Sequence, residues 1–335
     1  MNILSDFYSY NDQMQKNFFR DNALTKNELI ELRLGLLEIV HLLIKKEDFN
    51  EKECKSILLY LQQESQKPED VRLTVDVLQL LVAAMTPKSE AVHKSIIKLN
   101  GYNVFLTLMH TQSEFIRLWT VKMLGKIMIY SPLYLPKYKS SQIQRDASAM
   151  KKYLEGYNFT DTIYCVLLEI LFENISTQVI ENPITHITQQ MKQESAQPSA
   201  PTSPMVKSDS KTNITVPAAI AHAGPLFKVP HMIPVIFELL CLRADYKLKI
   251  RALKDFVFLV NSSNENKITF LKQNNWQSWV FALLALDVNY SIEEENNLVQ
   301  LIIDLLSTLL GFCFSQVLAL ASKISMADNL ILIQL

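Results

Sequence analysis

Glycine is scarce in this chain, at 6 of 335 residues. Turn-rich β architectures use glycine in many of their turns, so this scarcity argues against sheets and favours helices. The cysteines, too, lack the paired spacing of zinc sites and redox motifs. They lie far apart among apolar residues, which predicts reduced core thiols: Cys54, Cys165, Cys241 and Cys313.

The signatures of common catalytic and cofactor sites are absent from the sequence. The six histidines form no HExxH or HxH pattern and pair with no cysteine. No glycine-rich nucleotide-binding turn and no G-x-S-x-G elbow occurs. Because helical scaffolds seldom assemble a pocket from dispersed residues, we expect no enzyme activity, no metal, no cofactor and no small-molecule substrate.

Neither sign of charge is in excess, with 33 Lys and Arg against 34 Asp and Glu and a net charge of −1. Nothing therefore draws the whole molecule toward nucleic acid. The first residues contain no basic region followed by an apolar one, so no secretory signal is visible. We expect a cytoplasmic protein, with peripheral association to intracellular membranes through its partners as a further expectation.

The chain does contain a repeated phrase. PEDVRLTVDVLQLLVAAM (68–85) and SEFIRLWTVKMLGKIM (113–128) place Arg72 and Arg117 45 residues apart, and YKLKIRALKDFVFLV (246–260) repeats the phrase with Arg251. Periods of about 40 to 47 residues are typical of armadillo and HEAT units, which stack because no unit can bury its apolar face alone. The pattern predicts an all-α, armadillo/HEAT-like α-solenoid, a fold that offers surface to partners.

Capping signals and apolar spacing give the expected helices. They lie over residues 25–44, 51–63, 68–85, 90–99 and 102–109, with another that starts at Ser113 as its N-cap. Asn100 and Gly101 suit a left-handed helix end. In the later copy we align Asn274-Asn275-Trp276 with Asn100-Gly101-Tyr102.

A low-complexity stretch interrupts the repeats. Residues 194–224 are rich in Pro, Ser, Thr and Ala and poor in aromatics, which predicts a disordered insert. The predicted organisation is an N-terminal segment, partly helical or disordered (1–24), a first armadillo-like segment (25–173), a linker (174–228, disordered around 192–225), a second armadillo-like segment (229–321) and a C-terminal tail (322–335).

The longest apolar run covers residues 298–321 and is long enough to span a bilayer. Gln300, Asp304 and Gln316 count against insertion. We therefore interpret the run as a solenoid helix that is buried on all sides. Two alternatives stay open: a membrane anchor, or a helix offered to a partner's groove through apolar anchors, namely Val299, Ile302, Ile303, Leu306 and Leu310.

Basic side chains recur on two of the expected long helices: Arg117, Lys122 and Lys126 on one, and Lys247, Lys249, Arg251 and Lys254 on the other. The ordinary interpretation is a solvated face on which the repeat arginines Arg72, Arg117 and Arg251 brace adjacent units. The alternative is a ridge for acidic peptides or anionic lipid headgroups.

The three tryptophans complete the set of structural or interaction candidates. Trp119 follows Arg117 in the second copy of the phrase, and Trp276 and Trp279 are three apart, so they share one helix face. We expect the Trp276 and Trp279 pair to pack between layers. If the pair were exposed, it would instead be the leading binding spot, because tryptophan is enriched at interfaces.

Several phrases, taken in order, resemble one family. KQNNWQSWVFALLAL (272–286), followed by SIEEENNLVQLIIDLLSTLL (291–310), is similar to the W-Q-x-W segment in the armadillo-like region of neurobeachin-type BEACH proteins. DVRLTVDVLQLL, GYNVFLTLMHTQSEFIRLWTVKMLGK and IYSPLYLP (129–136) resemble the preceding helices of that region. The resemblance implies a large cytoplasmic scaffold in vesicle traffic and membrane-protein sorting, with PH-like, BEACH and WD40 parts after the helical region.

This chain carries none of those last three parts, and after Gly311 its sequence departs from the family pattern. We therefore expect a short paralogue or a truncated gene model. The resemblance supplies no catalytic residue. The resulting hypothesis is a non-catalytic scaffold that binds a peptide or helix in a solenoid groove. The alternatives are a membrane-anchored helical protein using residues 298–321 and a generic armadillo-type peptide-binding adaptor unrelated to BEACH proteins.

Overall fold

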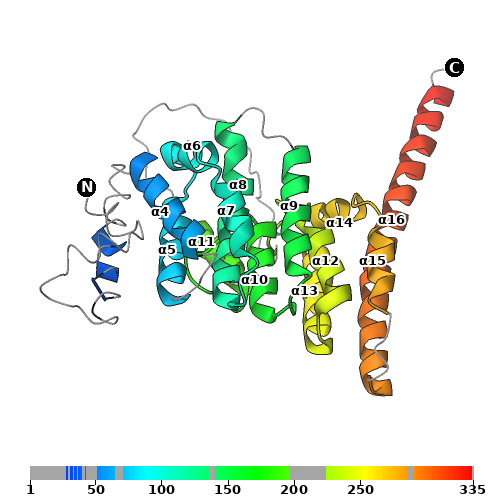
Figure 1. Ribbon diagram of the computed structural model, residues 1–335. Helices are drawn as coiled ribbons and strands as arrows, with labels where there is room; N and C mark the ends of the chain where they lie inside the picture. The colour runs from blue at the N-terminus through cyan, green and yellow to red at the C-terminus, as the bar shows by residue number, and fades with distance from the viewer. Residues whose placement is uncertain are drawn as a thin grey trace, which may run out of the picture. The chain divides into compact units, whose positions relative to one another are not determined.

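The computed structural model describes residues 28, 31, 32, 34, 35, 37–39 and 42, and then 51–64, 71–135, 140–196, 224–284 and 290–333. Every regular element among these residues is an α-helix (Figure 1), so the all-α prediction is confirmed. The described residues of the helix predicted over 25–44 are helical. Most of the predicted disordered stretch, residues 197–223, lies outside the described residues.

The described helices divide between two compact units. Unit 1, within Met1–Glu181 and Leu242–Ala244, contains α4 (Glu51–Glu64), α5 (Val71–Ala84), α6 (Glu90–Lys98), α7 (Gly101–Leu108), α8 (Glu114–Tyr134), α9 (Ser140–Leu154) and α10 (Asp161–Leu171). Unit 2, within Asn182–Cys241 and Asp245–Leu335, contains α11 (Pro183–Ala196), most of α12 (Met232–Arg243), α13 (Tyr246–Ser262), α14 (Asn264–Leu271), α15 (Trp276–Ala282) and α16 (Ile292–Ile333).

Helix α8 lies at the centre of unit 1. Every side chain from Ile116 to Met128 is buried, because α5, α7 and α10 all pack against this helix. Gly125 permits a close approach of α10: a Cβ atom there would lie 2.6 Å from Cγ1 of Ile170. A helix surrounded in this way is apolar on nearly all sides, which is why its sequence shows no clean amphipathic stripe.

The long helices of both units begin with the same capping arrangement. The side chains of Ser113, Thr160 and Asp245 each accept a hydrogen bond from the backbone N–H three residues further on, at 3.4, 3.4 and 2.8 Å. Such a cap satisfies one of the N–H groups that the first turn leaves without a partner. The cap at Ser113 was predicted from the sequence and is confirmed.

Side-chain contacts between successive repeats recur at one separation. Pairs 46 or 47 residues apart are Lys98 with Glu51, Lys122 with Glu169, Tyr157 with the carbonyl of His110, Thr160 with Glu114, and Thr308 with Asn261. Lys122 and Glu169, for example, lie equally far after the caps Ser113 and Thr160 of two successive long helices. The structural period is therefore slightly longer than the 45 residues between Arg72 and Arg117.

Two asparagines adopt the left-handed conformation that the helix junctions require. Asn100 has φ 57° before α7, and Asn275 has φ 60° before α15. The prediction of a left-handed end is confirmed at Asn100, whereas Gly101 is already helical and is needed because a Cβ there would meet Ile96 at 2.9 Å. Our alignment of the two copies was wrong by one residue: Asn275 matches Asn100, and Trp276 matches Gly101.

The core of unit 2 is aromatic. Phe237 of α12, Phe256 of α13 and Phe270 of α14 lie with ring centres 4.8 to 6.1 Å apart, each pair edge to face. Beside them Asn266, which is 0% exposed, holds the segment that precedes α12. Its amide accepts from the N–H of Phe227 at 2.9 Å and donates to the carbonyl of Pro225 at 3.0 Å.

The structure differs from the predicted organisation at two places. Helix α11 occupies residues 183–196, inside the stretch for which a linker was predicted, and α16 continues as a helix to Ile333, through most of the predicted C-terminal tail. The four cysteines also differ in burial. Cys54 and Cys165 are buried as expected, but Cys241 and Cys313 are half-buried.

Candidate functional site

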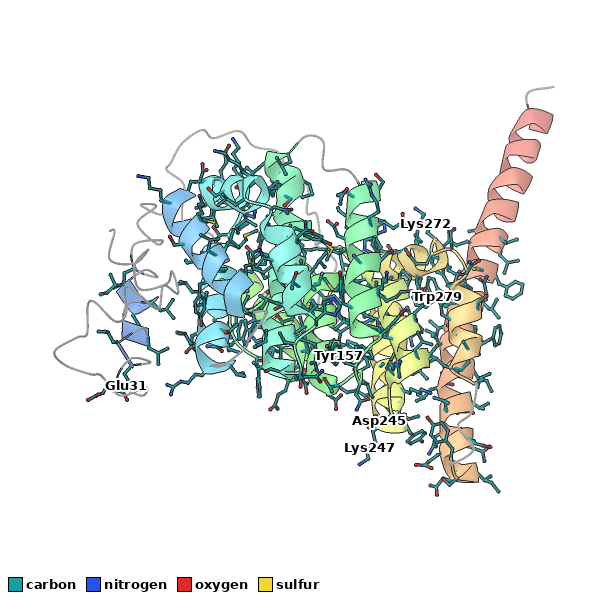
Figure 2. All side chains as sticks on the ribbon, in the orientation of Figure 1. Glu31, Tyr157, Asp245, Lys247, Lys272 and Trp279 are labelled. Atoms are coloured by element: carbon teal, nitrogen blue, oxygen red, sulfur yellow. The ribbon has the colours of Figure 1, made fainter. Side chains whose placement is uncertain are left out.

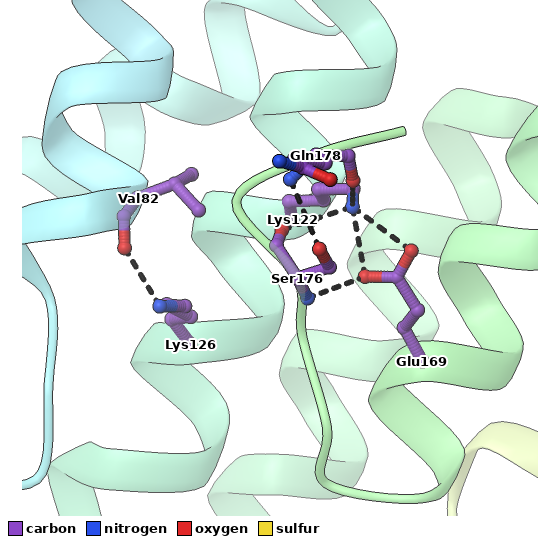
Figure 3. A network of polar contacts seen from close by, with 6 residues as sticks. All are labelled: Val82, Lys122, Lys126, Glu169, Ser176 and Gln178. Carbon is purple, nitrogen blue, oxygen red and sulfur yellow. Dashed lines mark hydrogen bonds and ion pairs between the residues drawn. The ribbon is translucent and has the colours of Figure 1, made fainter. Parts of the chain in front are cut away.

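A buried network of charged side chains connects three parts of unit 1 (Figure 3). We call it the α8 lysine network; it consists of Lys122 and Lys126 on α8, Glu169 on α10, and the backbone groups that they bind. Lys122 is 0% exposed and donates to both carboxylate oxygens of Glu169, at 2.9 and 2.8 Å. It also donates to the carbonyls of Ser176 and Gln178, at 3.0 and 2.7 Å.

The second lysine binds the opposite neighbour of α8. Lys126 lies one turn after Lys122 and donates to the carbonyls of Val82 and Met85, at 2.7 and 3.0 Å. Val82 is in the last turn of α5 and Met85 follows directly after it, where backbone acceptors have no partner within the helix. A cation at this end also interacts favourably with the helix dipole. Lys126 therefore acts as a C-terminal cap supplied by the next repeat.

Burial shifts the pKa of each charged group toward its neutral form. It raises the pKa of Glu169 to about 7, and the adjacent Lys122 opposes that rise. Burial lowers the pKa of Lys122, and Glu169 opposes that change. The pKa of Lys126 is lowered to about 8 by burial and, secondarily, by the charge of Lys122. Lys122 keeps a bidentate carboxylate partner, whereas the hydrogen-bond acceptors of Lys126 are carbonyls.

Two expectations for the basic side chains of α8 are corrected. We interpreted Arg117, Lys122 and Lys126 as part of a solvated basic face, but they are only 7%, 0% and 6% exposed. The reason is that α8 is covered on nearly all sides, so its cations bind groups inside the unit. They are not available to an acidic peptide or a lipid headgroup.

Arg117 connects α8 to the segments on either side of it in sequence. Its Nη1 donates to the carbonyls of Thr111 and Gln112, at 2.6 and 2.9 Å. Its guanidinium carbon lies 3.8 Å from the centre of the Tyr157 ring. The Tyr157 hydroxyl in turn donates to the carbonyl of His110 at 2.7 Å. Arg117 thus stacks on a tyrosine one repeat away.

Unit 2 repeats this arrangement at Lys249. Arg117 is the fourth residue after the cap Ser113, and Lys249 is the fourth after the cap Asp245, which Figure 2 labels at the start of α13. Lys249 is 6% exposed, and its Nζ lies 5.7 Å from the ring centre of Tyr290. The place of Arg117 is therefore taken by Lys249 in unit 2. Arg251, which the sequence alignment put there, is half-buried and pairs with Asp255 of its own helix at 4.0 Å.

The remaining candidates occupy varied surroundings. Arg72 is exposed on α5, and no hydrogen bond or ion pair joins it to another described residue. Trp119 is 2% exposed in the core of unit 1. Trp276 is 7% exposed and lies edge-on to Phe270, with ring centres 5.8 Å apart. Trp279 is half-buried, with its ring centre 6.4 Å from that of Phe237.

The network residue that sequence reasoning missed is Glu169. It is a lone acidic residue in the apolar run YCVLLEILF (164–172), just as Lys122 is a lone cation among Val121, Met123 and Leu124. An isolated charge inside an apolar helix needs a partner. A search for opposite charges one repeat period apart would have found this pair, because the two residues are 47 apart.

Helix α16 presents a different kind of surface. Leu298, Ile302, Leu305 and Leu309 are 0 to 2% exposed where the helix packs on α13. Other apolar side chains of α16 remain exposed, among them Leu310 at 50%, Phe314 at 67% and Leu318 at 70%. Figure 2 shows side chains of α16 that project into open space. The interpretation of residues 298–321 as a helix buried on all sides is therefore wrong.

By length and composition, the part Ile292–Ala319 of α16 would suffice to cross a bilayer, and 22% of its most apolar window is buried. Core helices of soluble proteins pass the same test. Among the described residues, no group of three or more His, Cys, Asp or Glu side chains is placed to hold a metal ion.

Comparison with known proteins identifies the region. The family model described as "Neurobeachin/BDCP, DUF4704 alpha solenoid region" matches residues 1–318. No solved structure matches this chain.

Proposed function

Because this chain belongs to the Neurobeachin/BDCP DUF4704 alpha solenoid family, we propose that it is a protein-interaction scaffold in vesicle traffic and membrane-protein sorting. The match confirms the predicted resemblance and the predicted α-solenoid, and it sets aside the adaptor unrelated to BEACH proteins. In this proposal the chain works in the cytoplasm, peripheral to intracellular membranes. It binds proteins rather than nucleic acid or small molecules.

The observation that carries this proposal is the α8 lysine network. A scaffold needs a fixed surface, and a solenoid fixes its surface by holding neighbouring repeats in register. Lys122 and Lys126 hold α8 to the loop after α10 and to the end of α5. Both cations are buried, so they serve the stacking of the helices and are not displayed to a substrate. This use of charge supports a binding platform.

Proximity labelling in cells tests the proposal. The full chain is fused to a biotin ligase and compared with the free ligase. The matched pair is Lys122→Met, which leaves Glu169 buried without its cation, and Lys122→Met/Glu169→Leu, which removes both charges. We expect the wild type and the double variant to label one set of proteins, enriched in coat, tether and sorting factors, and the single variant to lose it. Labelling no different from that of free ligase would refute the proposal.

A membrane-anchored protein is the second candidate, and the exposed apolar side chains of α16 are the observation that favours it. A spanning helix needs about 20 consecutive apolar residues that are free to face lipid. One side of α16 is already packed on α13 as far as Leu309, so the scaffold is preferred. Carbonate extraction separates the two: a scaffold is released into the supernatant, and an anchored protein stays in the pellet.

A further inference from the structure

Helix α16 carries two apolar stripes on adjacent sides. The inner stripe packs on α13 and is buried. The second, which we call the outer stripe, consists of Val299, Ile303, Leu306, Leu310, Cys313 and Val317. Val299 is 37% exposed, Ile303 47%, Leu310 50% and Val317 62%, while Leu306 and Cys313 are half-buried. No other described helix covers this stripe fully.

The spacing of the outer stripe identifies the kind of surface that fits it. Its residues follow one another at intervals of four, three, four, three and four. Alternating intervals of three and four keep side chains on one line along a helix, which is the seam of a coiled coil. The stripe runs for about 27 Å at 1.5 Å per residue. Its best counterpart is another helix with the same spacing.

We propose that the outer stripe is the interface between two copies of this chain, whose α16 helices pair in antiparallel orientation. In such a pair Val299 faces Val317 of the second copy, Ile303 faces Cys313, and Leu306 faces Leu310. All six residues then have an apolar partner from the same stripe. The surface is thus complementary to itself, as the interface of a two-fold symmetric dimer must be.

Charge favours the antiparallel orientation. Helix α16 begins with Glu293, Glu294 and Glu295. A parallel pair would bring the six carboxylates of two copies together, whereas the antiparallel register separates the two groups by about 45 Å. Between Leu305 and Ala319 the helix contains no charged residue that would oppose association.

Oligomeric state gives the first test. The full chain is studied by size-exclusion chromatography with light scattering from about 1 to 100 µM, because the dimer fraction of a reversible pair depends on concentration. We expect a dimer, and we expect Leu310→Glu to weaken it at least about 100-fold, since it buries a charge in the seam. The control Phe115→Glu changes an apolar residue of unit 1 that is 63% exposed, and it should leave the dimer intact.

Disulfide formation tests the register. In the proposed pair Cys313 lies opposite Ile303 of the second copy, so Ile303→Cys should form a covalent dimer through Cys313 under mild oxidation. The wild type should not, because its two Cys313 residues are about 15 Å apart along the helices. A wild-type chain that crosslinks through Cys313 pairs in another register and overturns the proposal.

Two further outcomes would also overturn it. One is a wild-type chain that stays monomeric over the whole concentration range. The other is a monomer that binds anionic phospholipid vesicles and loses this binding in Leu310→Glu, which would assign the outer stripe to lipid. Circular dichroism of each variant verifies that the helices are intact, so a loss of dimer is not mistaken for a loss of fold.

Discussion

Removal of one member of the Lys122 and Glu169 pair should destabilise unit 1 far more than removal of both. Lys122→Met leaves the carboxylate of Glu169, on a residue 1% exposed, without its cation. Glu169→Leu leaves the ammonium of Lys122, which is 0% exposed, without its anion. Breaking a buried pair from one side typically costs about 3 to 5 kcal/mol, because an uncompensated charge stays in the interior. We expect each single variant to lose that much free energy of unfolding.

The double variant Lys122→Met/Glu169→Leu leaves neither charge behind. It does leave the N–H of Ser176 without Glu169 and the carbonyls of Ser176 and Gln178 without the lysine. Ser176 is half-buried and Gln178 is exposed, so water replaces these partners at small cost. The new Met and Leu side chains have volumes similar to those of the Lys and Glu that they replace. We expect the double variant to lie within about 2 kcal/mol of the wild type, which corresponds to a coupling energy of several kcal/mol between the two sites.

The pH dependence of the two single variants should differ in sign. Burial already raises the pKa of Glu169 to about 7 in the wild type, and Lys122→Met removes the charge that opposes this rise, so the pKa rises further. The loss of stability relative to wild type is therefore small near pH 5, where Glu169 is protonated in both folded chains, and grows as the pH rises above about 7. Burial already lowers the pKa of Lys122, and Glu169→Leu removes the charge that opposes this change, so the deficit is full at neutral pH and shrinks toward pH 10.

Hydrogen exchange read by mass spectrometry on peptides of α8 and α10 measures the opening free energy of unit 1 without averaging over unit 2. Each variant is compared with the wild type at the same pH. A single variant within about 1 kcal/mol of the wild type, or a double variant as unstable as the sum of the two singles, would show that the two charges do not stabilise each other.

Three further predictions follow from the packing. Gly125→Ala should destabilise unit 1 by about 1 to 3 kcal/mol in a urea titration, since its Cβ would meet Ile170 at 2.6 Å, whereas the helical Gly311, with nothing within 4 Å, should tolerate alanine or gain up to about 1 kcal/mol. Asn266→Leu should cost unit 2 about 2 to 4 kcal/mol by the same assay, because it leaves the N–H of Phe227 and the carbonyl of Pro225 without this partner; a cost below about 1 kcal/mol would contradict this. The lowered pKa of Lys126 should make the wild type more stable as the pH rises from about 8 to 10.5, and Lys126→Met should remove this rise. A variant whose stability depends on pH as the wild type's does would contradict this.

Much of unit 1 could be predicted from the sequence because its signals are local. The capping serine at Ser113, the left-handed corner at Asn100 and the apolar spacing of α4 to α8 each depend on a few neighbouring residues. The alignment of the later copy failed by one residue at Trp276 and by two at Arg251. The alignment failed there because it matched arginine with arginine. The two copies instead share a cap and a buried cation four residues after it, which is Arg117 in one and Lys249 in the other.

The candidate site was harder to predict because burial is not a local property. Lys122 and Lys126 resemble ordinary surface lysines in spacing, and only the three helices packed around α8 put them inside. At α16 the error is the opposite one, because burial was predicted where side chains are exposed. Its apolar run predicts burial on every side, but unit 2 supplies α13 and a little of α14 as neighbours, so part of the run stays exposed.

The sequence by itself determined that this chain is a helical repeat protein and to which family it belongs, since both follow from the order of short patterns along the chain. The tertiary structure alone decided which charges face inward, because a pair such as Lys122 and Glu169 meets only when repeats stack 47 residues apart. It also decided which apolar side chains of α16 stay exposed. Both depend on the neighbours that each helix finds in space, and no stretch of sequence specifies those neighbours on its own.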